Sequence, residues 1–327
     1  MIGATPWIVS VGIIVALMAF DFWAQMRSPH EPTFRQSVRW TGFYVAAALI
    51  FGASMLWWRD AQSAQEFIAG YVTEWSLSVD NLFIFLIIFT RFKVPAELRQ
   101  RVLWFGVAVA LVLRGLFIWA GATALERYSW VFYLFGVFLV WTAIGVARKH
   151  EDDESDYHEN IMMRGLRKVF PSTRAYHGKA LTVREGKRRL ATPLLLVMLA
   201  VGTTDVLFAL DSIPAIFGLT LDPFIVFTAN AFALMGLRQL FFLIHGMLDR
   251  LIYLSYGLAV ILGFIGVKLI LHALHVNELE FINDGEPLLG VPDIGIGFSL
   301  TVIVGALGVA AVASLLVTRR REARSRV

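Results

Sequence analysis

The chain contains no cysteine and few charged residues. Without cysteine among its 327 residues it can form no disulfide, no thiolate metal site and no cysteine nucleophile. Charged residues make up only 17% of the chain, against about 25% in soluble proteins. Because 57% of the residues are hydrophobic, the composition excludes an ordinary soluble globular protein and indicates a membrane protein.

Long apolar runs predict the number of membrane spans, because a helix needs about 20 apolar residues to cross a bilayer. The first run has no Lys or Arg before Arg27, so it lacks the basic segment of a secretory signal peptide and we expect it to be retained. We predict an all-α polytopic membrane protein with about nine transmembrane helices, embedded in a lipid bilayer. The runs lie near residues 6–25, 38–58, 67–90, 102–121, 129–147, 193–218, 223–245, 251–271 and 294–317.

The basic residues lie almost entirely in alternate loops. The predicted loops on one side, with the C-terminal tail, hold 24 of the 29 Lys and Arg residues, whereas the other side holds only Arg59, Arg127 and Lys268. By the positive-inside rule the basic side is cytoplasmic. We therefore predict a cell (plasma) membrane protein with its N-terminus outside and its C-terminus in the cytoplasm. The net charge of +4 reflects these loops, so we expect no nucleic-acid partner.

Two similar segments predict an internal repeat. Residues 67–147 and 193–271 each contain three predicted helices, and Leu113-Arg114 in the first matches Leu237-Arg238 in the second. Because three is odd, the second unit enters the membrane from the opposite face. Inverted repeats of this kind are typical of secondary transporters, whose binding site lies near the bilayer midplane between the repeats. Three segments lie outside the two units: 1–66 with two N-terminal helices, the cytoplasmic loop 148–192, and 272–327 with an outer acidic loop, the ninth helix and a basic tail.

The loop 148–192 is the only sizeable segment predicted outside the membrane. It begins with an acidic cluster over residues 151–156 and becomes basic toward its end. Residues 176–188 favour a short hairpin that turns at Glu185-Gly186. We expect a solvated connector without chemistry of its own.

Carboxylates six residues apart occur within two of the apolar runs. A charged side chain at the bilayer centre costs at least about 2.5 kcal/mol, so such acids mark an ion path, a proton relay or a buried pair. Their recurrence in both units favours a transport site over purely structural pairing. The candidate metal ligands are Glu74, Asp80, Asn81, Asp205, Asp211 and Ser212. The candidate supporting residues are Thr204, Pro214, Arg114, Arg238, Asn230 and Asp21.

The helical period limits how these acids can meet. Residues six apart lie about 120° from each other around a straight helix, so gathering all four acids requires a kinked or unwound helix. Pro214 supplies a cause for a break, since it cannot donate to the carbonyl of Leu210. The freed carbonyl beside Asp211 is a further candidate ligand.

Charge and ligand chemistry suggest which ion such a site would bind. Four carboxylates and the two arginines leave two net negative charges, which one divalent cation would neutralise. Alternatively, two Arg–carboxylate pairs could form with the remaining acids protonated, because burial raises carboxylate pKa values. The candidate ligands are all hard oxygens, which suit Mg²⁺, Ca²⁺ and Mn²⁺ better than copper or zinc.

The chain resembles the TerC family of integral membrane proteins, in particular its branch of Alx-like proteins within the LysE-like transporter superfamily. The resemblance covers most of the chain. The segments that carry it are EWSLSVDNLF at 74–83, TDVLFALDSIPA at 204–215, DPFIVFT at 222–228, Leu237-Arg238, Asp249-Arg250, YGLAVIL at 256–262, and Asp21 with Arg27 and His30.

The resemblance implies that the protein exports Mn²⁺, which would be the transported ion, and we expect no permanently bound cofactor. The family is also associated with tellurite resistance. Gly202-Thr203 departs from the family pattern, in which we expect a glutamate, so kinship supports divalent-metal transport better than manganese alone.

Two other classes of function compete with transport. The resemblance leaves open a role in membrane-protein assembly, or in supplying metal to other proteins, without transport of its own. An intramembrane aspartyl protease is disfavoured, because no Gly-x-Gly-Asp sequence surrounds Asp80, Asp205 or Asp211. We therefore expect no enzymatic activity.

Overall fold

The computed structural model describes residues 3–27, 32–148, 173, 175–185, 188–245, 253–280, 282–288 and 290–324. Within these residues nine helices are long and apolar enough to cross a membrane, which confirms the predicted all-α polytopic class. The elements are α1 (Ala4–Arg27), α2 (Phe34–Trp58), α3 (Ala61–Arg91), α4 (Ala96–Arg127), α5 (Trp130–Arg148), β1 (Thr182–Glu185), β2 (Arg188–Ala191), α7 (Pro193–Phe217), α8 (Pro223–His245), α9 (Leu254–His275), η3 (Asn283–Gly285) and α10 (Ile296–Arg324).

Each predicted span coincides with one of these helices, but α3 and α4 are longer than predicted. The cause in α3 is a cap: the Asp60 carboxylate accepts a hydrogen bond of 2.6 Å from the backbone N–H of Ser63. A side-chain oxygen in this place satisfies one of the unpaired N–H groups at a helix start. The same hydrogen bond lowers the pKa of Asp60 below its ordinary value.

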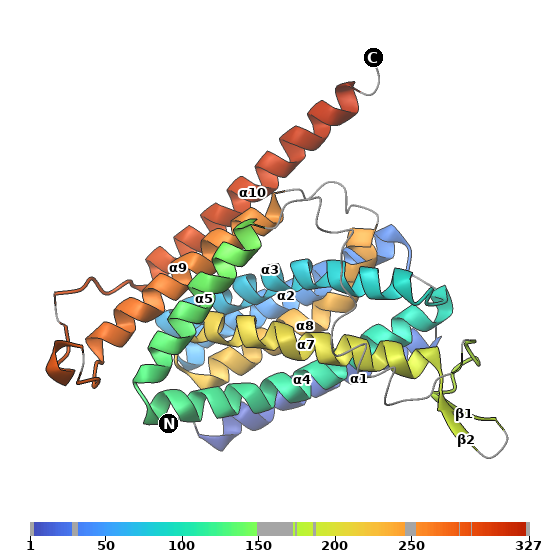
Figure 1. Ribbon diagram of the computed structural model, residues 1–327, viewed down its shortest axis with the longest axis horizontal. Coiled ribbons are helices and arrows are strands. Elements are labelled where there is room, and N and C mark those ends of the chain that lie inside the picture. Colours follow the sequence, from blue (N-terminus) through green and yellow to red (C-terminus); the bar gives the residue numbers. More distant parts are fainter. Residues whose placement is uncertain are drawn as a thin grey trace.

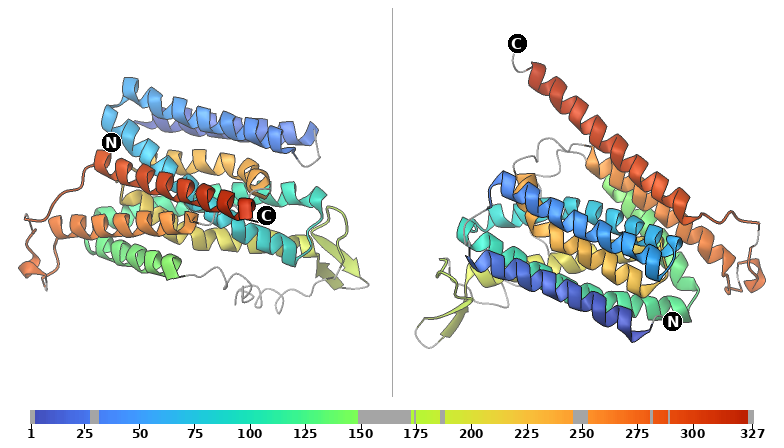
Figure 2. Two further views of the ribbon diagram at one scale, coloured as in Figure 1. Left: turned by 90° about the horizontal axis from the view of Figure 1, so that it is seen from above. Right: turned by 180° about the vertical axis from the view of Figure 1, so that it is seen from behind.

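The helices form a bundle with α3, α7 and α8 at its centre. Helix α8 is the most buried span, whereas α1, α2 and α10 bury little of their surface. Helices α1 and α2 lie on one face of the bundle and α5 on the opposite face (Figures 1 and 2). The exposed side chains of the outer helices include large apolar residues such as Trp57, Trp119 and Val309, as expected for surfaces that face lipid.

The two predicted three-helix units pack against each other. The most extensive helix contact joins α5 to α9, and α3 packs on α8 as α4 packs on α7. Exchanging α3 with α7, α4 with α8 and α5 with α9 leaves this set of contacts unchanged. Such a pattern is the one that a two-fold relation between the units would give, and the inverted repeat itself stays a prediction.

Glycine allows α5 and α9 to approach closely. A Cβ atom at Gly136 would lie 2.8 Å from the carbonyl oxygen of Gly266 and 2.6 Å from the Ile270 side chain. The two helices run antiparallel, because Phe132 packs on His272 near the start of α5 and the end of α9. This opposite direction is the one expected for equivalent helices of inverted units.

A hairpin is present in the loop predicted to be cytoplasmic, and its second strand extends to Ala191, beyond the predicted segment 176–188. Strands β1 and β2 pair antiparallel from Thr182 with Ala191 to Glu185 with Arg188. The turn therefore falls between Glu185 and Arg188, and the acidic cluster predicted at 151–156 lies outside the described residues. The Tyr176 hydroxyl donates 2.9 Å to the carbonyl oxygen of Phe92, and burial raises the pKa of Tyr176 to about 12.

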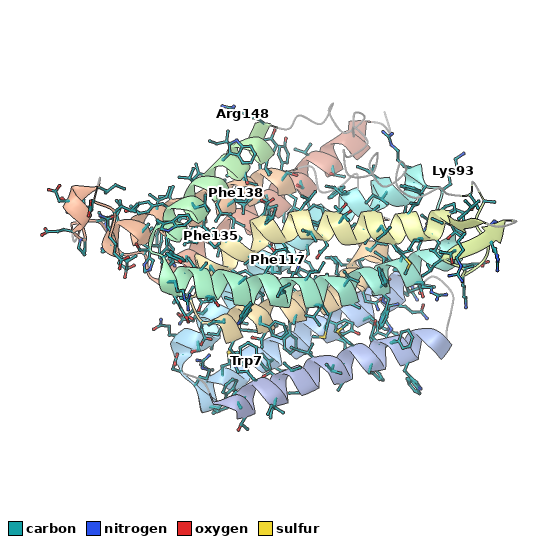
Figure 3. All side chains as sticks on the ribbon, turned by 60° about the horizontal axis from the view of Figure 1, so that its bottom comes forward. Trp7, Lys93, Phe117, Phe135, Phe138 and Arg148 are labelled. Atoms are coloured by element: carbon teal, nitrogen blue, oxygen red, sulfur yellow. The ribbon has the colours of Figure 1, made fainter. Side chains whose placement is uncertain are left out.

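The two ends of the bundle differ. The hairpin lies at one end, and the start of α1 lies with the α9–α10 connection at the other (Figure 1). Lys93 lies at the hairpin end and Trp7 toward the opposite end (Figure 3). The hairpin and Lys93 (Figures 1 and 3) belong to two loops that the sequence groups on the same side of the membrane.

Candidate functional site

Arg114 on α4 joins acids from both predicted units. Its guanidinium forms an ion pair with the Glu74 carboxylate on α3 and another with Asp205 on α7, where Nη2 lies 3.3 Å from Oδ1. Nε of Arg114 approaches the other oxygen of Asp205 at 3.5 Å, and Nη1 donates 3.2 Å to Oγ of Ser212. We call Glu74, Arg114, Asp205 and Ser212 the central cluster.

The central cluster is closed off from the surface. Arg114 and Ser212 are each 1% exposed, Asp205 is 2% exposed and Glu74 is fully buried. Counted as ionised groups, two carboxylates and one guanidinium carry one net negative charge. The Oε2 atom of Glu74 has no hydrogen-bond partner, although a buried polar atom normally has one. The cluster thus combines a surplus of negative charge with a carboxylate oxygen available to a further ligand.

Asp211 forms its described hydrogen bond outside the central cluster. It is only partly buried, and its Oδ1 accepts a hydrogen bond of 3.4 Å from Thr142 on α5. The separation follows from the helical period, which turns Asp211 about 120° away from Asp205. Helix α7 continues unbroken past Pro214 to Phe217, so the predicted unwinding does not occur. Pro214 lies in the last turn of α7, so the one hydrogen bond that its missing N–H removes, to the Leu210 carbonyl, lies close to the helix end.

The remaining candidates on α3 and α7 lie along the same two helices. Thr204 is buried beside Asp205, and Asn81 is partly buried on α3. Residue 80 belongs to α3, but the side chain of Asp80 lies outside those that the structure describes. Of the five predicted ligands whose side chains are described, the structure brings Glu74, Asp205 and Ser212 together around Arg114.

Arg238 has a separate partner. Its Nη2 lies 2.6 Å from Oδ1 of Asp21 on α1, to which the Tyr44 hydroxyl also donates at 2.8 Å. Gln239 Nε2 approaches the same oxygen at 3.4 Å. The pair lines a cavity of about 20 Å³, room for about one water molecule. Arg238 thus forms an ion pair with an acid from a helix outside the predicted repeat.

Most of the polar atoms without a partner belong to helices α3 and α8. Twelve buried side-chain N or O atoms in the described part of the chain have no hydrogen-bond partner within the protein, and eight of them belong to α3 and α8. Both amide atoms of Asn230 are among them, although Asn230 is only 1% exposed. The other residues are Thr73, Glu74, Trp75, Ser78, Arg238 and Gln239. Such groups are costly inside a membrane unless water or an ion satisfies them.

A larger polar cavity opens at the end of the bundle opposite the hairpin. Its volume is about 420 Å³, and Glu66, Lys268 and Asp293 are among its lining residues. The Thr220 hydroxyl donates 2.5 Å to Glu66. Since Glu66 precedes Glu74 by eight residues on α3, the two lie about 12 Å apart along the helix axis.

Several of these residues carried no clear signal in the sequence. Tyr44 and Thr142 are single polar residues in apolar runs, which are common and do not indicate a site. Asp21 looked weak because it lies near a span end, and Glu66 fell just before the predicted start of its span. The extra helical turns of α3, set by the Asp60 cap, bring Glu66 into the bundle.

Comparison with known proteins agrees with this architecture. The family described as integral membrane protein TerC family matches residues 59–322. An uncharacterized membrane protein of Mycobacterium bovis is 46% identical over 318 residues, which cover 96% of this chain and 80% of the relative. A Myxococcus xanthus membrane protein is 39% identical over 96% of this chain and 92% of the relative.

Alx of Escherichia coli (strain K12), named as a candidate membrane-bound redox modulator, is 42% identical over 270 residues, covering 79% of this chain and 84% of Alx. No solved structure matches the chain significantly. The family match covers most of the nine-helix bundle and includes the whole central cluster. The chain therefore belongs to the integral membrane protein TerC family.

Proposed function

We propose that this protein transports a divalent metal cation, with Mn²⁺ as the first candidate, through the central cluster. The observation that carries the proposal is the pair of buried carboxylates, Glu74 and Asp205, supplied by the first helix of each predicted unit. A structural role would need only one acid for Arg114. The second acid leaves a net negative charge inside the membrane, which a transported cation can neutralise.

The ligand set favours hard cations. Glu74 and Asp205 offer carboxylate oxygens and Ser212 a hydroxyl, a chemistry that suits Mn²⁺, Mg²⁺ and Ca²⁺. Among the residues that the structure describes, no three His, Asp or Glu side chains converge on one point. We propose Asp80 and Asn81, two turns beyond Glu74 on α3, as the ligands that complete coordination during transport.

The unpartnered polar atoms support a hydrophilic path across the bundle. Thr73 and Trp75, on either side of Glu74 in α3, carry two of them, and the 420 Å³ cavity gives an approach from the predicted outer side. Moving a divalent cation outward against 100 mV costs about 4.6 kcal/mol, twice the value for a single charge. Export therefore needs coupling, and we propose inward protons as the coupling ion.

Orientation in the membrane can be tested directly, because the chain has no native cysteine. We propose that it lies in the plasma membrane with the hairpin inside. A cysteine introduced by Asn283→Cys, in the α9–α10 connection, should react with a membrane-impermeant maleimide in intact cells. One introduced by Lys179→Cys, beside the hairpin, should react only after lysis. The opposite pattern would reverse the topology.

Metal content of cells tests transport. We would express the protein in a manganese-sensitive bacterial host and measure cellular Mn, Fe, Mg, Ca and Zn by mass spectrometry. We expect a selective fall in manganese that disappears in Glu74→Gln and Asp205→Asn. Asp60→Asn is the matched control, because Asp60 is an exposed acid at the start of the same helix as Glu74. Unchanged metals with well-expressed protein would contradict manganese export.

A further inference from the structure

We infer that Arg114 is an internal counter-cation: its guanidinium occupies the place of the transported ion between Glu74 and Asp205, and it must withdraw before a divalent cation binds there. The inference rests on the proposed function. It assigns to Arg114 the selection of divalent over monovalent cations at the central cluster.

The contacts of Arg114 are those expected of an ion at this position. Its guanidinium bonds to both carboxylates and to the Ser212 hydroxyl, which are three of the oxygen ligands proposed for the metal. Carboxylate oxygens that accept from a guanidinium point their lone pairs at it. The same lone pairs cannot at that moment coordinate a metal. Apart from Oε2 of Glu74, which has no partner, the two cations therefore compete for one set of oxygens.

Burial makes this competition obligatory. With Glu74 and Asp205 both sealed from the surface, an empty site without Arg114 would hold two uncompensated like charges in a low dielectric. With Arg114 in place and a metal added, two cationic groups would repel each other at close range. While both carboxylates are ionised, the favourable states are therefore the one with Arg114 bound and the one with metal bound.

The exchange also predicts selectivity by charge. When Na⁺ or K⁺ replaces the guanidinium, the cluster keeps the same net charge of minus one, and the bonds to Arg114 are lost without electrostatic gain. When a divalent cation replaces it, the two carboxylates become fully neutralised. Arg114 therefore prevents monovalent cations from binding at the cluster, although their concentration exceeds that of trace metals.

Arg59 provides a matched control. It forms an ion pair of 2.6 Å with Asp222 near the end of α2, and both side chains are partly exposed. Its substitution breaks an Arg–Asp pair of the same chemistry without changing the central cluster.

The test is Mn²⁺ binding to the purified full-length protein in detergent, measured by equilibrium dialysis with radioactive manganese. We expect Arg114→Gln to bind Mn²⁺ at least tenfold more tightly than wild type. Arg114→Lys should bind a few-fold more tightly, because an ammonium lacks the planar fork that bridges two carboxylates. Arg59→Gln should stay within twofold of wild type.

A competition experiment tests the selectivity. We expect 150 mM NaCl to weaken Mn²⁺ binding by the Arg114→Gln and Arg114→Lys variants more than the same concentration of choline chloride does. In wild type the two salts should act equally. A difference between the salts in wild type equal to that in both variants would overturn the selectivity assignment.

The outcomes separate this inference from the proposed function. If Glu74→Gln and Asp205→Asn abolish binding but Arg114→Gln and Arg114→Lys bind no more tightly than wild type, transport through the cluster stands and the counter-cation role is overturned. If wild-type binding survives both acid substitutions, the cluster is not the metal site and both proposals fail. Should Arg114→Gln not purify as a monodisperse protein, Arg114→Lys alone decides, since it retains the charge.

Discussion

Removing Arg114 should destabilise the protein far more than removing either of its acidic partners. In Glu74→Gln, Arg114 keeps two contacts with Asp205, at 3.3 and 3.5 Å, and the cluster becomes neutral. We expect a loss of about 1.5 kcal/mol, the low end for a hydrogen bond to a charged group, because Arg114 keeps its contacts with Asp205. In Arg114→Gln both carboxylates stay buried without a cation, and breaking a buried pair in this way costs about 3–5 kcal/mol.

The effects of Glu74→Gln and Arg114→Gln on the free energy of unfolding should not add, and the sign of the difference is the most specific expectation. Adding Glu74→Gln to Arg114→Gln removes one of two uncompensated charges, so the double variant should be more stable than Arg114→Gln alone. Independent substitutions would instead add their losses. The Arg59–Asp222 pair is a control: its side chains are 17% and 23% exposed, so Arg59→Gln should cost only about 1 kcal/mol, as partly solvated pairs do.

Denaturant or thermal unfolding of the detergent-purified variants, followed by circular dichroism, would measure these differences. Saturating Mn²⁺ should restore stability to Arg114→Gln, because a ligand that binds only the folded state stabilises it. The reasoning fails if the double variant is less stable than Arg114→Gln by the full cost of Glu74→Gln, since the two carboxylates would then not repel each other.

Three further expectations concern the scaffold. Gly136→Ala should lose about 1–3 kcal/mol by forcing α5 away from Gly266, whereas Gly145→Ala, where nothing lies within 4 Å, should be near neutral in the same unfolding assay. Because the pKa of Tyr176 is about 12 in the folded protein, above its ordinary value of 10, its contribution to stability is present below pH 10 and lost as the pH rises from 10 toward 12. An unfolding midpoint that falls equally in wild type and Tyr176→Phe would contradict this. Asp60→Ala should lower the thermal midpoint while Asp60→Asn largely preserves it, since Asn also caps helices. Because the pKa of Asp60 is lowered, the wild type should lose its stability advantage over Asp60→Ala as the pH falls through and below the ordinary value near 3.8. A wild-type advantage that persists at that pH would refute the cap.

The spans could be predicted from sequence because hydropathy acts locally. Each of the nine apolar runs became one helix, and errors were confined to helix ends such as the start of α3, where Asp60 adds turns that hydropathy does not register. The hairpin likewise followed from local turn chemistry. The pairing of α5 with α9 through Gly136 and Gly266 depends on which helix faces meet, which no local pattern specifies.

The site was predictable only in part. Glu74 and Asp205 stood out because carboxylates are costly in a membrane, and the structure brings both to Arg114. Which acid pairs with which arginine could not be predicted from the sequence, because Arg238 pairs with Asp21 from a helix outside the repeat. Nor could the sequence show that Asp211 would turn toward Thr142, since that required knowing that α7 continues unbroken through Pro214.

Flux of Mn²⁺ into proteoliposomes that contain a manganese-quenched fluorophore tests the central claim most directly. With the purified wild-type protein we predict quenching well above that of empty liposomes, and a fall to the empty-liposome rate in both Glu74→Gln and Asp205→Asn, while Asp60→Asn keeps the wild-type rate. Wild-type flux in the Glu74→Gln or Asp205→Asn protein, or no Mn²⁺ flux with the wild-type protein under an imposed proton gradient of either direction, would contradict transport through this pair of carboxylates.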